Sequence, residues 1–186
     1  MEGTRTSLTV ISCNIARPAT FEHNGRQVHT GIFKEPVDGP VFLDTLGVRG
    51  DLIADLRVHG GPKKAVYAYP SEHYPFWAAK LGRPSLPWGT LGENLTTVGI
   101  DENSVHIGDR FRIGKALVEA TKPRLPCFKL AFKLGTNDAL RWMREEGVFG
   151  IYFAVIEVGE VQPGDSIECV LSNDESSTIR SKGMSA

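Results

Sequence analysis

Short runs of apolar and β-branched residues, separated by Gly, Pro, Asn and Asp, recur along the whole chain. The runs 7–15 (SLTVISCNI), 65–69 (AVYAY) and 150–158 (GIYFAVIEV) each predict a strand. Further short strands are expected within 30–47, 52–58, 105–113 and 116–121. The pattern therefore predicts about eight to ten short strands, which is typical of a closed or strongly curved β-barrel.

Two stretches have a helical pattern instead and are expected as helical insertions in this mainly β fold. Ser71 can cap a short helix that runs through Lys80. Thr136 or Asn137 can cap a longer helix, which the glycine at position 147 would end.

Length, composition and charge describe a single globular domain with a short polar tail. The chain has 186 residues, of which 41% are hydrophobic and 23% charged, and one domain is expected over 1–171. Residues 172–186 lack aromatic side chains and predict a flexible C-terminal tail. The formal net charge of −1 and the lack of a long apolar run argue against nucleic acid or a membrane as partner.

The cysteines indicate a reducing environment. Cys13, Cys127 and Cys169 are odd in number and widely spread, which argues against a disulfide framework. The N-terminus lacks a secretory pattern, so a cytoplasmic location is expected. No Cys-x-x-Cys pair occurs, which argues against a structural zinc site.

The strongest candidate for chemistry is the segment 122–130 (KPRLPCFKL). It places Cys127 between two prolines and beside the cations Lys122, Arg124 and Lys129. The prolines predict a stiff turn, and nearby positive charge favours the thiolate that attacks electrophiles or binds metal. Because a lone cysteine is more commonly buried and inert, both interpretations stay open from these residues alone.

Two further stretches carry a weaker functional signal. In 58–64 (VHGGPKK), two glycines beside His59, Lys63 and Lys64 predict either an anion pocket or a tight turn with solvated lysines. In 89–97 (GTLGENLTT), Asn94 offers a donor and an acceptor that suit the edge of a heterocycle. The alternative is an asparagine that hydrogen-bonds its own turn.

Taken together and in this order, three motifs resemble the MOSC domain family, most closely its bacterial YiiM-type branch. They are the His-Gly-Gly loop at His59, Gly-Glu-Asn-Leu at Gly92, and Pro-Arg-x-Pro-Cys-x-Lys-Leu ending at Leu130. The likeness covers residues 28–170 and implies a MOSC-type β-barrel with a cysteine near the cofactor end. By position, Cys127 matches the cysteine that ligates molybdenum, and Asn94 matches an asparagine near the pterin.

The resemblance implies a molybdenum-cofactor (molybdopterin) oxidoreductase that reduces N-hydroxylated compounds such as 6-hydroxylaminopurine. Cys127 would be the catalytic metal ligand, and Glu93 would accept from an amino-pyrimidine edge. The candidates to bind the cofactor phosphate are Arg124, Lys122 and Lys63, with Arg49 and Arg57 as further candidates. His59 and Lys63 match positions of the family's His-Gly-Gly loop, where contact with an anion is expected. An external flavin or iron–sulfur protein would supply electrons, since the sequence has no flavin, haem or iron–sulfur motif. Purification can remove such a cofactor.

Two alternatives use the same cysteine. One is a non-catalytic cofactor carrier or sulfur-relay module, in which Cys127 holds the cofactor transiently or carries a persulfide. The other is a metal-free thiol hydrolase or transferase, with His59 as the base.

Longer YiiM-type relatives carry a helical extension after the barrel, whereas a short polar tail follows Val170 here.

Overall fold

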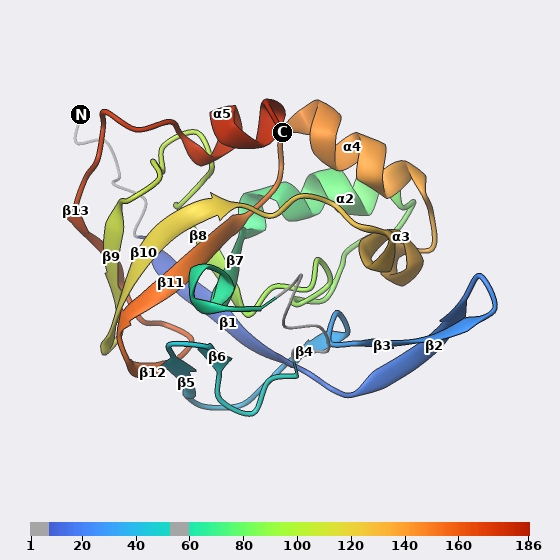
Figure 1. Ribbon diagram of the computed structural model, residues 1–186, viewed down its shortest axis with the longest axis horizontal. Helices are drawn as coiled ribbons and strands as arrows, with labels where there is room; N and C mark the ends of the chain where they lie inside the picture. The colour runs from blue at the N-terminus through green and yellow to red at the C-terminus, as the bar shows by residue number, and fades with distance from the viewer. Residues whose placement is uncertain (1–7, 53–59) are drawn as a thin grey trace.

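The computed structural model describes residues 8–52 and 60–186, and within them a large antiparallel-rich sheet is covered by short helices (Figure 1). The strands of the large sheet are β1 (Thr9–Ala16), β4 (Lys34–Pro36), β7 (Val66–Pro70), β8 (Leu95–Val98), β9 (Arg110–Ile113), β10 (Ala116–Pro123), β11 (Ile151–Glu157) and β13 (Ile167–Leu171). They lie in the order β13-β9-β10-β11-β7-β8-β1-β4, and the β7–β8 pair is parallel.

Two smaller sheets complete the β structure of the described residues. The remaining strands are β2 (Ala19–His23), β3 (Arg26–Thr30), β5 (Val41–Asp44), β6 (Gly47–Val48) and β12 (Gly159–Val161). Strands β2 and β3 form a long hairpin that extends away from the body, while β12, β5 and β6 form a three-stranded sheet (Figure 1).

The predicted closed or strongly curved barrel is wrong, although the mainly β class is confirmed. The large sheet is open, and its end strands are β13 and β4. A barrel needs a hydrogen-bonded ladder between its first and last strands. In the described part of the chain, β1 forms its ladders with β8 and β4. Where residues 8–10 meet the start of β13, the contact consists of an isolated bridge between Thr9 and Ser166 and the backbone hydrogen bonds beside it, and no ladder forms.

The helical segments lie mainly along one side of the sheet. They are the 3-10 turns η1 (Pro62–Lys64) and η2 (Ser71–His73) and the helices α2 (Tyr74–Lys80), α3 (Phe128–Leu134), α4 (Asp138–Glu146) and α5 (Ile179–Met184). The predicted helix after Asn137 is confirmed as α4, and Gly147 ends it with a φ of 70°. The predicted helix from Ser71 begins as a 3-10 turn, and no side-chain cap forms there.

Two hydrophobic clusters hold this arrangement together. One lies within the sheets and includes Leu43, Val66 and Phe153, which are fully buried. The other joins β7 to the helices through Tyr69, Trp77 and further buried side chains from α3, α4 and the segment before β11. Burial of an aromatic or aliphatic side chain of this size contributes about 1.5–3 kcal/mol, so the helices are fixed by packing rather than by their short hydrogen-bond ladders.

The C-terminal stretch differs from the predicted flexible tail. It contains α5, which Thr178 caps by accepting a hydrogen bond from the Ser181 backbone N–H at 3.1 Å. Ile179 is fully buried, and its backbone N–H donates to the Val105 carbonyl at 2.9 Å. One buried apolar side chain and these hydrogen bonds fix a segment whose overall composition is polar.

The strand expected at 52–58 lies almost entirely outside the described residues. Among the described helices, none has the length and apolar character needed to cross a bilayer.

Candidate functional site

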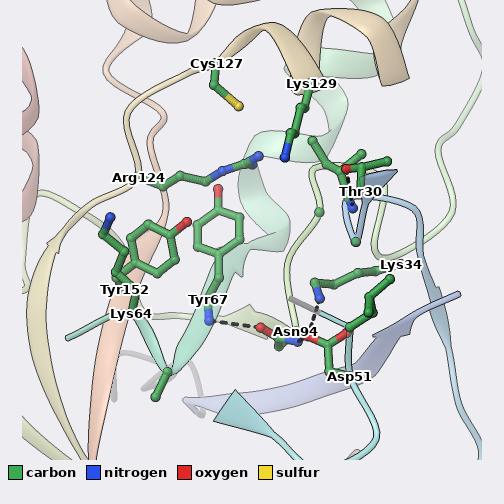
Figure 2. Close-up of a pocket in the computed structure, with 15 residues that line it drawn as sticks. Thr30, Lys34, Asp51, Lys64, Tyr67, Asn94, Arg124, Cys127, Lys129 and Tyr152 are labelled. Atoms are coloured by element: carbon green, nitrogen blue, oxygen red, sulfur yellow. Dashed lines mark hydrogen bonds and ion pairs between the residues drawn. The ribbon is translucent and has the colours of Figure 1, made fainter. Parts of the chain in front are cut away.

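A recess, here called the first recess, lies between the ends of β7, β10 and α3. It contains about 590 Å³ of space, part of it open to solvent. The lining residues come from six segments of the chain and are Thr30, Gly31, Ile32, Lys34, Asp51, Leu52, Lys64, Ala65, Tyr67, Gly92, Asn94, Arg124, Cys127, Lys129 and Tyr152. Figure 2 shows the Cys127 thiol at one end and Lys34 with Asp51 at the other.

Cys127 takes its place from the junction between β10 and α3. Its backbone is extended, with φ −136° and ψ 164°, and it is the residue immediately before the helix. Its carbonyl accepts a hydrogen bond from the Leu130 N–H at 2.9 Å, which begins the helical turn. The sequence predicted a stiff turn here, whereas α3 was not predicted.

Three cationic side chains line this recess together with the thiol. Arg124 follows β10 directly, Lys64 ends η1, and Lys129 lies in the first turn of α3 (Figure 2). The Arg124 side chain donates to the Leu91 carbonyl, and its guanidinium carbon lies 4.9 Å from the centre of the Tyr67 ring. Burial opposes the Arg124 charge, but Tyr67, Tyr152 and Cys127 outweigh this effect and raise its pKa. The thiol therefore lies beside a permanent positive charge.

A buried ion pair forms the opposite end of the recess. Lys34 pairs with Asp51, and their side chains are only 8% and 3% exposed. Asp51 also accepts from the Ala16 N–H at 2.7 Å and from the Asn94 amide nitrogen at 2.8 Å. Burial lowers the pKa of Lys34, and Asp51 opposes that shift. The carboxylate is thus tied to three separate segments of the fold.

Asn94 has a clear structural task within this network. Its side-chain oxygen accepts from the Tyr67 N–H at 3.2 Å, while its amide nitrogen donates to Asp51. Its own backbone N–H donates to the Tyr67 carbonyl at 2.7 Å. These contacts hold β7 against the start of β8. Asn94 lines the recess, as the sequence suggested, but its amide already bonds to protein groups.

Two phenols form the wall between the cations. Burial raises the pKa of both Tyr67 and Tyr152, and Arg124 opposes the shift in each case. Both phenols are therefore neutral hydroxyls at physiological pH. The Tyr67 hydroxyl donates to the Phe149 carbonyl at 2.9 Å.

Glu93 lies behind the recess and supplies negative charge from there. It is fully buried, and its Oε1 accepts from the Gly89 N–H and the Thr96 hydroxyl, each at 2.9 Å, and from Tyr74. Its other oxygen has no hydrogen-bond partner among the described residues. Burial lowers the pKa of Lys133 to about 8, and the Glu93 charge opposes that shift. The Lys133 ammonium donates to two backbone carbonyls nearby.

A second recess adjoins the first and shares the thiol with it. It contains about 850 Å³ of space, including space open to solvent. Its lining residues are Lys64, Lys122, Pro123, Arg124, Leu125, Pro126, Cys127, Tyr152, Lys182 and Ala186. Cys127 thus lies between two recesses rather than at the bottom of one.

The structure brings together some of the residues predicted from the sequence and separates others. Cys127, Asn94 and Arg124 line the first recess, and Lys122 lines the second. Lys63 is exposed and Glu93 is buried, and neither lines a recess. His59 lies outside the described residues, so its role stays a prediction.

Several lining residues were not predicted as site residues. They are Lys34, Asp51, Lys64, Tyr67, Lys129 and Tyr152. Lys64 belongs to the loop for which the sequence offers an anion pocket, and Lys129 is one of the cations beside Cys127, but neither was assigned to the site. The other four lie on strands or loops whose local sequence resembles ordinary packing.

The remaining cysteines are poor candidates for chemistry. Burial raises the pKa of Cys13 to about 12, and its thiol donates to the Val161 carbonyl at 3.6 Å. Burial, followed by Asp109, raises the pKa of Cys169 as well. In the described residues, no group of three or more His, Cys, Asp and Glu side chains could hold a metal ion.

Comparison with known proteins agrees with the resemblance seen in the motifs. The MOSC domain family model matches residues 55–168. The uncharacterized protein YflK of Bacillus subtilis is 42% identical over 172 residues, which are 92% of this chain and 77% of that protein. The YiiM protein of Escherichia coli is 38% identical, over 76% of this chain and 64% of its own length.

A protein of Gibberella moniliformis named as a reductase is 37% identical over 77% of this chain, but that match covers only 26% of the fungal protein. The chain therefore spans less than two thirds of the E. coli protein and about a quarter of the fungal one.

Comparison with solved structures also finds proteins of the YiiM type. The crystal structure of YiiM from Geobacillus stearothermophilus has a TM-score of 0.78 at 34% identity, covering 95% of this chain and 82% of that one. The E. coli YiiM structure has a TM-score of 0.69 at 29% identity, covering 97% and 76%. On the family model and these relatives, the chain belongs to the MOSC domain family, in its YiiM-type branch.

Proposed function

We propose that the protein binds a molybdenum cofactor at Cys127 and reduces small N-hydroxylated compounds, of the type of 6-hydroxylaminopurine, to amines. One observation carries this proposal: a thiol lies between two recesses whose lining also includes the cations Arg124, Lys64 and Lys129. The fungal relative named as a reductase supports the reaction class, although the chain matches only part of it.

The side chains around Cys127 fit this cofactor chemically. A sulfur donor suits a soft metal, and cationic side chains suit a phosphate group. The described residues offer no complete ligand set for a bare metal ion, and a pterin dithiolene would bring the missing sulfur ligands with it. When bound, the cofactor supplies two-electron redox chemistry at the metal.

The protein's own residues would bind and orient the reactants. Arg124, fixed by Leu91 and Tyr67, would hold positive charge beside the sulfur and favour the thiolate. Lys64 and Lys129 would contact the cofactor phosphate. The neutral Tyr67 and Tyr152 would limit the entry of water, since their raised pKa keeps both protonated. Tyr152 would donate a hydrogen bond to a reactant, whereas the Tyr67 hydroxyl donates to the Phe149 carbonyl.

The overall reaction converts an N–OH group and two protons, with two electrons, into an N–H group and water. The electrons would come from an external flavin or iron–sulfur protein. Among the described side chains, Cys13 is buried and Cys169 lies on β13, so neither could join Cys127 as a dithiol donor.

The direct test measures molybdenum per chain after expression in a host that makes the cofactor. Near-stoichiometric metal is expected in the wild type and in the control Cys169→Ser. Cys127→Ser should lose both the metal and the reduction of 6-hydroxylaminopurine. Wild-type protein without metal, when prepared from such a host, would contradict the proposal.

The same preparation distinguishes the proposed reductase from a cofactor carrier or a sulfur-relay module. A chain that binds cofactor but reduces no N-hydroxylated substrate with any donor would be a carrier. A mass increase of one sulfur atom at Cys127 would identify a sulfur relay instead.

A further inference from the structure

A buried glutamate that lines neither recess joins three distant parts of the fold. The side chain of Glu102 is only 1% exposed. One of its carboxylate oxygens accepts from the Gly150 backbone N–H, and the other lies 2.7 Å from Nε2 of His73 in η2. The Glu102 backbone carbonyl accepts from the Arg180 N–H of α5 at 2.9 Å. Glu102 therefore contacts η2, the residue before β11 and the C-terminal helix.

The segment 148–150, directly before β11, connects this glutamate with two tyrosines of β7. The backbone carbonyls of its first two residues accept from the hydroxyls of Tyr69 and Tyr67, at 3.0 Å and 2.9 Å. Its third residue, Gly150, donates its N–H to Glu102. Each residue of the segment thus contributes one backbone group, two of them to tyrosines and one to the buried carboxylate.

The segment lies so close to the Tyr67 ring that its third position has room only for glycine. Gly150 has a φ of +69°, and a Cβ atom added there would lie 2.6 Å from a carbon of the Tyr67 ring. The Tyr67 side chain is itself buried. Because a close-packed interior transmits displacements, a shift of the Gly150 backbone would move the ring.

Tyr67 in turn contacts a cation of the candidate site. Its ring centre lies 4.9 Å from the guanidinium carbon of Arg124, and both residues line the first recess. Figure 2 shows the Tyr67 hydroxyl directed toward the Arg124 side chain. Since an aromatic ring attracts a guanidinium group, the place of the ring influences where the Arg124 charge lies in the recess.

We propose that Glu102 is a positioning residue of the candidate site. It fixes the segment 148–150, and through this segment it sets the place of Tyr67 and Arg124 in the first recess. The inference rests on the proposed function for the role of that recess. His73 holds the second carboxylate oxygen and so helps to orient Glu102. Neither His73 nor Glu102 lines a recess, so both would act on the site only through Tyr67.

The first measurement needs neither cofactor nor substrate. The chain has four tyrosines, so protein labelled with 3-fluorotyrosine should give four fluorine NMR signals, and Tyr67→Phe identifies the signal of Tyr67. Glu102→Gln keeps an oxygen acceptor for the Gly150 N–H and should leave this signal in place. Glu102→Leu has a similar volume but no acceptor, and it should shift the signal. The matched control is Glu119→Leu, whose carboxylate pairs with Arg110 at 2.8 Å and lines neither recess.

The same connection can be tested from its other end, which covers the case that Glu102→Leu does not fold. Tyr67→Phe removes only the hydroxyl that donates to the Phe149 carbonyl. Amide hydrogen exchange at Gly150 should then be at least about tenfold faster than in the wild type. Tyr152→Phe is the control, because it removes a phenol hydroxyl from the same recess that donates to neither carbonyl of the segment.

The cofactor-loaded protein shows whether this positioning matters for the reaction. The kcat/KM for 6-hydroxylaminopurine should fall about tenfold in Glu102→Leu and stay at the wild-type value in Glu102→Gln and Glu119→Leu. The double variant of Glu102→Leu and Tyr67→Phe should lose no more than the more affected single variant, because both changes act through one ring.

An unmoved Tyr67 signal in folded Glu102→Leu would overturn the proposal, as would unchanged exchange at Gly150 in Tyr67→Phe. Additive losses of kcat/KM in the double variant would also overturn it. Wild-type protein without molybdenum would contradict the proposed function instead, and the NMR and exchange measurements would still decide whether Glu102 positions Tyr67.

Discussion

At the scale of single residues, Asp51 connects the candidate site to the core of the fold. Its carboxylate bonds to Lys34, to the Asn94 amide and to the Ala16 backbone N–H. Nothing in the local sequence marks Asp51, because the aspartate follows a glycine in an apparent turn. Asn94 was predicted as a site residue from its type and neighbours, and its contact with Asp51 depends on tertiary structure that the sequence does not display.

Replacing Asp51 by Asn should destabilise the protein strongly. The change keeps the shape but leaves the Lys34 ammonium buried beside a neutral group. Breaking a buried ion pair in this way costs about 3–5 kcal/mol. Urea unfolding followed by tryptophan fluorescence should show a loss of that order in the free energy of unfolding.

Asp44→Asn is the matched control, since Asp44 pairs with Arg49 at 3.4 Å on the surface. Exposed pairs contribute little to stability, so this variant should unfold at the wild-type urea concentration. Similar losses in Asp51→Asn and Asp44→Asn would show that the buried pair is not a stabilising contact.

At the scale of elements, capping residues made one helix predictable, and packing produced two that were not. α4 begins after Asn137 and ends at Gly147, as its sequence indicates. α3 follows a proline-rich segment and α5 lies in a polar tail, so neither has a strong local signal. Each helix is held in place by only a few buried side chains, such as Leu130 in α3 and Ile179 in α5.

The contact between α5 and Phe149 gives a test of this packing. A Cβ atom added at Gly183 would lie 2.4 Å from carbons of the Phe149 ring, which is fully buried. Gly183→Ala should therefore cost about 1–3 kcal/mol, although alanine favours a helix. Thermal unfolding should show a lower midpoint for this variant.

Ser181→Ala is the control on the same helix, because the Ser181 side chain is exposed. It should unfold within error of the wild type. If Gly183→Ala proves neutral or stabilising, α5 does not pack closely against Phe149 in solution.

At the scale of the whole molecule, the sequence predicted strands better than it predicted their order. Alternation and turn residues locate β1, β7 and β11, because these signals lie within a few residues of one another. Sheet closure depends on which strands become neighbours, and β1 pairs with β8 and β4. No local pattern encodes that choice, so the barrel prediction had only the strand count and the resemblance to support it.

The burial of Lys133 is likewise a property of the whole fold, and it makes the stability of the protein depend on pH. Lys133 of α3 donates to the carbonyls of Ile32 and Gly89, at 2.8 Å and 2.6 Å, so it joins three distant segments. Burial lowers its pKa from 10.5 to about 8. The folded chain thus binds fewer protons at this site than the unfolded chain between about pH 8 and 10.5.

Since unfolding takes up a proton in that range, stability should rise as the pH increases through 8. From pH 7 to pH 9.5, the titration of Lys133 should increase the free energy of unfolding by about 2 kcal/mol. Above about pH 10 the buried tyrosines act in the opposite direction, because burial raises the pKa of Tyr67 and Tyr69 in the folded state. Urea unfolding at pH 7, 8, 9 and 9.5 would measure the rise before that loss begins.

The variant Lys133→Met removes the titrating group and should lose this part of the pH dependence. Lys80→Met, at an exposed position, should keep it. An NMR titration of the Lys133 side chain should give a midpoint near 8, well below that of an exposed lysine. Equal pH profiles for the wild type and Lys133→Met would show that Lys133 does not bind the Ile32 and Gly89 carbonyls as a buried ammonium.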